Sequence, residues 1–395
     1  MSSKKKPIGS SPPARPSQKP PSGLQIAWDL LGSMELTVAL IVLMMVLVFF
    51  GTIHQVQLGT WLAQKKYFSS WLLFFETENG FRFPIFPGGY ALGSLWLVNL
   101  LASHSARARW EWRRAGLLLT HGGLFVLLLG QGLTQMFSRE SQMAIEEGQT
   151  ANHSEDSRDA ELAVIDVSGP TEDVVHTFPV SLLEKEDALQ HPDLPFEVVV
   201  KKFFPNAVLG RGGNTLATMG VGSRVSVMEA PRVTADDESD NISSFIEIRA
   251  GGQSHGVWLV SMALGAPQTF VFKDKTYRLA LRATRHYMPF NLTLKDFTHD
   301  VYPGTDIPKN FSSLLRLQDK ETGEDRDVLI YMNHPLRYRG LTFFQASFGK
   351  GDRLSILQVV RNPVWVTPYL ACLLVCLGLA WQFLAHLVRF RRGIP

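Results

Sequence analysis

The chain has 395 residues, of which 45% are hydrophobic and 19% charged, and its formal net charge is only +3. Its mean hydropathy is near zero, and the apolar residues are clustered, so a single soluble domain is not the expected architecture. The sequence contains no P-loop, GxSxG, CxxC or zinc-type Cys/His spacing, so no enzyme class that such motifs mark is indicated.

Four apolar runs have the length and composition of membrane-spanning helices. They cover residues 34–53, 88–104, 115–137 and 363–388. The second run is the weakest because Asn99 interrupts it. It is counted because the distribution of charge requires an even number of spans.

The basic residues are concentrated in three segments that border these runs. Residues 1–33 form a tail rich in Pro, Ser and Lys that is expected to be disordered, and residues 105–114 and 389–395 are also basic. The positive-inside rule places all three in the cytoplasm, which requires four spans and exports the long segment 138–362. The first run is long, starts late and lacks a small-residue cleavage site, so we expect a retained anchor.

Two exported segments are expected. Residues 54–87 mix aromatic residues such as Trp61 and Trp71 with Lys65 and Lys66, which predicts an amphipathic helix lying in the membrane interface. Residues 138–362 contain many short β-type stretches separated by turn signals. The predicted fold class is therefore an integral membrane protein with four transmembrane helices and a large β-rich, antiparallel sandwich-like domain.

The two cysteines lie in the last apolar run and not in the β-rich domain, so the fold of that domain owes nothing to disulfides. Cys372 and Cys376 are expected to be small packing residues, because a helix holds positions i and i+4 poorly for a disulfide.

His121 lies inside the third apolar run, where a polar side chain needs a partner, a cavity or a cofactor. Gly116, Gly123 and Gly130 recur every seven residues and predict a close-packed helix face. His121 is rotated by roughly 200° from Gly123 and points away from that face. Two interpretations are open: a hydrogen bond to a neighbouring span, or a metal or haem ligand.

The other histidines carry weaker signals. His54, His104 and His386 are at the ends of spans, where interfacial histidines are common. The β-rich domain has seven histidines without a ligand spacing, and each is expected to be solvated or hydrogen-bonded. These are His153, His176, His191, His255, His286, His299 and His334.

Seven segments in chain order resemble the ResB family of cytochrome c biogenesis proteins. They read "GTWLAQKKYFSSW", "PGGYALGSLWLVNLLASH", "RRAGLLLTHGGLFVLLLGQGLT", "ESQMAIEEGQTANHSE", "FTHDVYPGTDIPKNFSSLLRL", "MNHPLRYRGLTFFQASF" and "VVRNPVWVTPY". The resemblance implies a non-autonomous subunit of the system II cytochrome c synthase in the bacterial cytoplasmic membrane, with its large domain on the periplasmic side.

The resemblance also implies a cofactor and partners. A transient haem b, shared with a CcsA/ResC-type multi-span partner, would be exported and joined to CxxCH apocytochrome c. By position, His121 best matches the family's membrane histidine that ligates haem iron, and His104 is second. No catalytic residue is assigned. A thioredoxin-like thiol-reducing protein is a further candidate partner, and no nucleic acid is expected.

Some relatives carry cysteines proposed for redox chemistry, and the exported domain here has none. A thiol-reducing role of the chain itself is therefore not expected. The alternative function is a membrane-anchored scaffold or apocytochrome-binding subunit without a haem ligand. A solute transporter is disfavoured by the small number of spans and the absence of paired intramembrane carboxylates.

Overall fold

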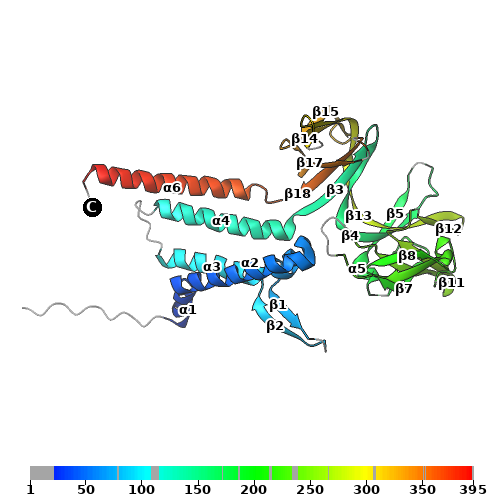
Figure 1. Ribbon diagram of the computed structural model, residues 1–395, viewed down its shortest axis with the longest axis horizontal. Helices are drawn as coiled ribbons and strands as arrows, with labels where there is room; N and C mark the ends of the chain where they lie inside the picture. Colours follow the sequence, from blue (N-terminus) through cyan, green and yellow to red (C-terminus); the bar gives the residue numbers. More distant parts are fainter. Residues whose placement is uncertain are drawn as a thin grey trace, which may run out of the picture. The chain divides into compact units, whose positions relative to one another are not determined.

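A computed structural model describes residues 22–393, apart from 78–79, 108–114, 171, 186, 213–215, 234–238, 266, 306–307, 350 and 352. The chain divides into two compact units (Figure 1). The helical unit consists of Met1–Phe50, Tyr67–Gly132 and Val366–Pro395. The β unit consists of Gly51–Lys66 and Leu133–Trp365.

The helical unit is built from long apolar helices and one hairpin. Its elements are α1 (Gly23–Leu31), the first part of α2 (Met34–Ala63), β1 (Leu72–Glu76), β2 (Arg82–Pro87), α3 (Gly89–Arg107), α4 (Ala115–Phe137) and α6 (Thr367–Arg391). Among the residues that the structure describes, three helical segments are long and apolar enough to cross a membrane: Met34–Phe68, Ala115–Phe137 and Thr367–Arg391. The fourth expected span corresponds to α3, whose composition does not reach that level, so the count of four remains a prediction.

Asn99, which weakens the apolar run of α3, is 2% exposed, and both polar atoms of its side chain are hydrogen-bonded. Its amide nitrogen donates to the carbonyl oxygens of Leu31 and Ser33 at 2.7 and 3.2 Å, and its oxygen accepts from the Thr37 hydroxyl at 2.7 Å. The side chain therefore fastens α3 to the junction between α1 and α2, where the backbone turns and its carbonyls need donors.

The sequence prediction for the tail and the first exported segment needs two corrections. Residues 23–31, expected to be disordered, form α1, whose start is closed by reciprocal hydrogen bonds between Ser22 and Gln25. Residues 1–21 lie outside the described residues, as do 108–114 of the predicted basic loop.

The second correction concerns residues 54–87, which do not form one interfacial helix. The helix α2 continues to Ala63 through a kink at Gly59, whose φ is 73°, and a short π-helix, Gln64–Phe68, follows. The antiparallel hairpin β1–β2 comes next. Its strands read LLFFE and RFPIFP, and aromatic residues favour extended backbone more than helix.

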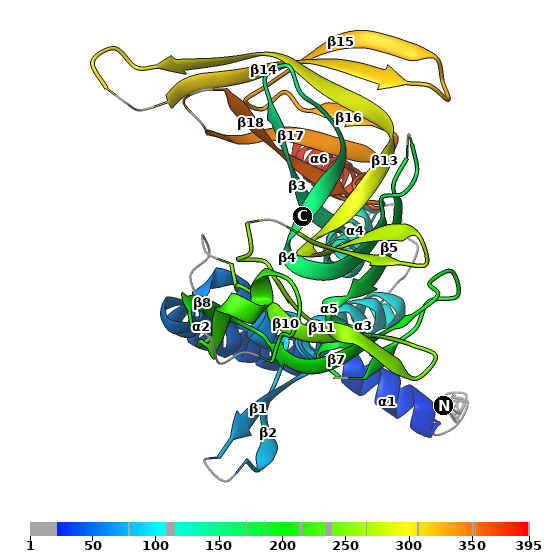
Figure 2. The same cartoon turned by 90° about the vertical axis from the view of Figure 1, so that its right-hand side faces the viewer.

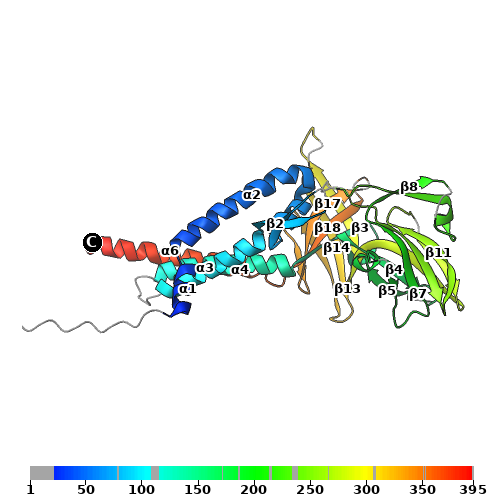
Figure 3. The ribbon, with the colours of Figure 1, turned by 90° about the horizontal axis from the view of Figure 1, so that it is seen from below.

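The predicted glycine face of α4 is confirmed and packs against α6, which runs beside α4 in Figure 1 and lies behind α3 and α4 in the view of Figure 3. A Cβ atom at position 123 would lie 2.7 Å from Val375 Cγ2 and 2.9 Å from the Ala371 carbonyl oxygen. Gly116 meets Gly378 of α6 in the same way. The missing side chains allow the two backbones to approach closely.

The β unit contains a ten-stranded sheet, a four-stranded sheet and a two-stranded hairpin, in which every strand pairing given by the described residues is antiparallel. The large sheet has the order β15-β14-β13-β4-β3-β18-β17-β16, with β12 on β13 and β5 on β4. The four-stranded sheet has the order β11-β10-β7-β6, and the hairpin is β8-β9.

The bounds of these strands are β3 Arg139–Glu146, β4 Thr150–Asp166, β5 Val174–Pro179, β6 Ala188–Leu189, β7 Glu197–Phe204, β8 Ala207–Arg211, β9 Val225–Glu229, β10 Ser243–Ala250, β11 Gln253–Ser261, β12 Gln268–Phe272, β13 Lys275–Val301, β14 Pro308–Asp319, β15 Glu324–Tyr331, β16 Leu336–Tyr338, β17 Leu341–Gly349 and β18 Leu354–Arg361. A short helix, α5, covers Val180–Leu183.

Two hydrophobic cores lie along the long strands β4 and β13, which pass through both halves of the β unit (Figure 2). Core 1 lies between the four-stranded sheet and the first part of β13, and includes Val198, Ile246 and Leu279. Core 2 lies inside the curled remainder of the large sheet and includes Leu292 and Phe343. The first half is a sandwich, as predicted. In the second half, Tyr331 of β15 bridges to His334 just before β16, so the sheet curls toward closure.

The glycine contacts generate a prediction for the helical unit. Gly123→Val should separate α4 from α6 and lower the thermal stability of the purified protein in detergent, at a cost of about 1–3 kcal/mol for overpacking. Gly122→Val is the matched control, because a Cβ atom there meets nothing within 4 Å. Equal unfolding temperatures for the two variants would contradict this packing.

The β unit carries an acid-sensitive carboxylate. Glu247 is 7% exposed and is bound by Lys201 at 2.8 Å and Arg249 at 2.6 Å. The hydrogen bond from Lys201, with those from Ser254 and Arg249, lowers the pKa of Glu247 to about 2. Because the folded pKa is depressed, the carboxylate's contribution to stability is complete above its unfolded pKa of about 4.3 and is lost as the pH falls through 2.

Glu247→Gln should therefore lower the unfolding temperature at pH 7 and flatten its decline between about pH 4.5 and 2, measured by circular dichroism. Glu172→Gln, at an exposed position, should keep the wild-type decline. A Glu247→Gln curve parallel to that of the wild type would refute the assignment.

Candidate functional site

The structure brings together the two histidines that the sequence singled out. His104 lies near the end of α3 and His121 in the first part of α4, and both are half-buried within the helical unit. Their ring centroids are 5.1 Å apart and the ring planes are inclined by 38°. The imidazoles are therefore in direct contact, which the sequence did not reveal.

The hydrogen bonds of the two rings leave an imidazole nitrogen available on each. His121 Nδ1 lies 2.9 Å from the carbonyl oxygen of Leu117, one turn earlier. A ring that donates its Nδ1 proton to a carbonyl keeps the Nε2 lone pair for a ligand. His104 hydrogen-bonds to the backbone of Leu118, and its buried Nε2 has no hydrogen-bond partner among the described residues.

This arrangement fits an iron ligand in two respects. A backbone carbonyl that fixes the tautomer of a ligating imidazole is a common feature of metal sites. An unpaired buried polar nitrogen, as at His104, costs about 1–3 kcal/mol unless something binds it. Because the rings touch each other, they do not enclose a flat macrocycle between them. The pair offers imidazole nitrogen from one side.

The remaining histidines of the apolar runs are placed differently. His386 of α6 has its Nε2 3.1 Å from the amide nitrogen of Gln382, one turn earlier on the same helix. His54 belongs to the part of α2 that lies in the β unit. The cysteines Cys372 and Cys376 are free and exposed on α6.

Five of the seven β-unit histidines lie beside a carboxylate or an aromatic ring, and the expectation that each is solvated or hydrogen-bonded stays a prediction. His153 and His286 lie 3.8 Å from carboxylates, and His255, His299 and His334 contact aromatic rings. The other two, His176 and His191, come together with Asp193. Sequence reasoning missed this cluster, because the histidines are fifteen positions apart, one on β5 and the other in the turn between β6 and β7.

The β unit also has a basic cavity of about 590 Å³. Arg139, Arg285, Arg361 and His286 line it together with apolar side chains such as Phe290. Arg139 and Arg361 are paired in register where β3 meets β18. Arg285 is bound by Glu155 at 2.9 Å. The cavity can hold anionic groups that are attached to an apolar body.

The sequence could not have indicated this cavity. Its walls come from β3, β4, β13, β17 and β18, which are far apart in the chain, and no local motif connects them. Two of its arginines, Arg139 and Arg361, lie at strand ends, but this position alone does not predict a cavity.

Comparisons with known proteins show which family the chain is similar to. The family model of ResB-like proteins matches residues 261–357. Protein NrfI of Wolinella succinogenes is 26% identical over 305 residues, which cover 76% of this chain and 30% of that protein. Cytochrome c biogenesis protein CcsB of Picosynechococcus is 34% identical over 80 residues, which cover 20% of this chain and 17% of that protein.

The chain thus spans less than a third of the length of these curated relatives. A solved structure, cytochrome c heme lyase CcmF, matches 74% of this chain and 31% of its own at 13% identity, and its TM-score of 0.21 is too low to establish a common fold. The family match, the two relatives, the apolar helices and the β-rich unit agree with one another. The chain is thus similar to proteins of the ResB-like family, whose model matches residues 261–357.

Proposed function

We propose that this chain is a component of the system II machinery of cytochrome c maturation. In this proposal it helps to carry haem b across the bacterial cytoplasmic membrane. With a CcsA/ResC-type partner, it presents the haem for thioether attachment to CxxCH apocytochrome c. A role in cytochrome c biogenesis is supported by the family and by the relative named for that process. The contact between His104 and His121 carries the more specific proposal.

Haem is the cargo, and His121 holds its iron through Nε2. The Leu117 carbonyl keeps the proton on Nδ1, so the ligating nitrogen is neutral and fixed in direction. His104 lies beside this ligand. It acts either as an alternative iron ligand or as a hydrogen-bond donor to the haem. A further ligand to the iron would come from the partner, because the two imidazoles of this chain are in contact with each other.

The proposal includes four spans, with α3 as the second, both termini in the cytoplasm and the β unit exported. Asn99 lowers the mean hydropathy of α3. Its polar atoms are hydrogen-bonded to residues of α1 and α2, so its presence adds little to the free-energy cost of placing α3 in the membrane. His104 and His121 then lie toward the cytoplasmic side, where haem enters.

The exported β unit would receive the acceptor protein. An extended CxxCH segment could add along an exposed strand edge, where backbone hydrogen bonds do not depend on side chains. The basic cavity can hold the carboxylates of haem. Thiol reduction falls to a separate thioredoxin-like partner, since both cysteines of the chain are on α6. Cross-links of apocytochrome confined to the CcsA/ResC-type partner would refute the strand-pairing step.

The absorption spectrum of the chain purified together with its partner tests the haem site. His121→Gly should lose most of the haem Soret band, and added imidazole should restore it by replacing the missing ligand. His104→Gly should shift or weaken the band to a smaller degree. His386→Gly is the matched control, because this histidine also lies on an apolar helix but is bound to Gln382.

The alternative function is a scaffold or apocytochrome-binding subunit without a haem ligand. It predicts an unchanged Soret band in His121→Gly and in the double variant with His104→Gly. That result would remove the haem-ligand proposal while leaving the family and the role in cytochrome c biogenesis intact.

A further inference from the structure

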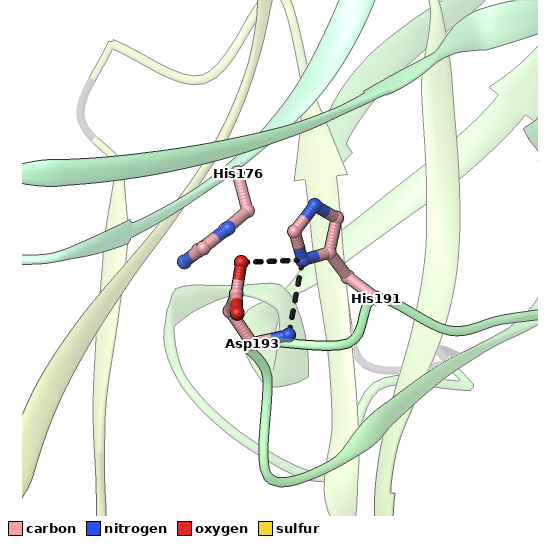
Figure 4. Close-up of side chains that lie close together, drawn as sticks. All are labelled: His176, His191 and Asp193. Atoms are coloured by element: carbon pink, nitrogen blue, oxygen red, sulfur yellow. Dashed lines mark hydrogen bonds and ion pairs between the residues drawn. The ribbon is translucent and has the colours of Figure 1, made fainter.

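Three side chains of the β unit converge at one point away from the histidine pair. His176 is on β5, and His191 and Asp193 are in the turn between β6 and β7. Figure 4 shows the carboxylate of Asp193 between the two imidazoles. One potential ligand atom from each residue lies within 4.8 Å of the others, and the imidazole centroids are 4.6 Å apart.

The backbone around this cluster is well anchored. The amide of Leu194 donates to the carbonyl oxygen of His191 at 3.0 Å, which closes the turn. Leu189 and Leu194, on either side of the two ligands, are buried in core 1. On the other side, β5 pairs along its whole length with β4, which places His176 opposite Val164. Both halves of the cluster are therefore fixed by the fold.

The distances suit a small divalent ion. Zinc binds imidazole nitrogen and carboxylate oxygen at about 2.0–2.2 Å, so two ligands at a tetrahedral angle are about 3.4 Å apart. His191 Nδ1 and Asp193 Oδ2 are 3.7 Å apart. The amide of Asp193 also donates to His191 Nδ1, but at 3.3 Å this is a long bond that a metal ion can replace.

The charged groups around the cluster are mostly acidic. Burial, followed by the proximity of His191, lowers the pKa of His176. Asp193 and Asp166 contribute negative charge, and Lys275 is bound to Asp166 at 2.7 Å. Two imidazoles and one carboxylate form a ligand set that suits zinc and similar transition-metal ions.

We propose that His176, His191 and Asp193 bind a divalent transition-metal ion of the zinc class. Three protein ligands leave one coordination position for water or another donor. The ion would fasten β5 to the turn between β6 and β7. This proposal does not depend on the haem function.

The test is metal binding by the full-length protein in detergent after treatment with a chelator. Co²⁺ titration should give visible absorption bands that saturate at one equivalent, and calorimetry should show Zn²⁺ binding at the same stoichiometry. His176→Ala and Asp193→Asn should each weaken Zn²⁺ binding at least tenfold and abolish the rise in unfolding temperature that Zn²⁺ gives the wild type.

The matched control is His153→Ala, which removes a half-buried imidazole that lies 3.8 Å from the Glu155 carboxylate and packs against the Tyr287 ring. It should bind Zn²⁺ as the wild type does. Unfolding curves in the absence of metal establish that each variant is folded. Absence of saturable binding in the wild type, or equal binding by all variants, would overturn the proposal.

Discussion

A polar side chain on an apolar helix must find a partner, and this constraint organises the helical unit. Asn99 is the clearest case, since all three of its hydrogen bonds join α3 to the chain between α1 and α2. His121 follows the same rule through the Leu117 carbonyl. The backbone hydrogen bonds of His104 and His121 each use one ring nitrogen, so the second ring nitrogen of each can bind a ligand. These two nitrogens form the proposed haem site.

The opposite face of α4 obeys a different constraint, close packing. Its glycines have no side chains to satisfy, and α6 fills the space with Ala371, Val375 and Gly378. A helix that is packed tightly on one face holds a ligand on the other face in a fixed position. The spacing of glycine and histidine along α4 therefore couples helix packing to ligand geometry.

The sequence predicted those features that depend on local periodicity. The seven-residue recurrence of glycine identified the packing face of α4, and alternation of apolar residues identified most strands of the β unit. It did not predict the pairing of His104 with His121, because the register between two helices depends on tertiary contacts. The hairpin β1–β2 was not predicted. The interfacial helix was inferred from Trp61, Lys65 and Lys66, which precede the hairpin, and was extended over aromatic residues that favour strands.

The cavity and the cluster of His176, His191 and Asp193 were invisible for the same reason, since each gathers residues from distant strands. Their positions in the chain nevertheless differ. Residues 167–274, between β4 and β13, supply most of core 1 and the metal cluster. The family match at 261–357 instead covers most of β13 and the strands to β18, which build most of core 2 and line part of the basic cavity.

This division separates the two proposals physically. Core 2 is continuous in the chain with α4 and α6 through β3 and β18, whereas core 1 is inserted between two strands of the large sheet. Changes at His176 or Asp193 alter side chains in the inserted half and leave the contacts of His104 and His121 within the helical unit unchanged. A loss of metal binding and a loss of haem binding would thus report on different parts of the molecule, and either can fail without the other.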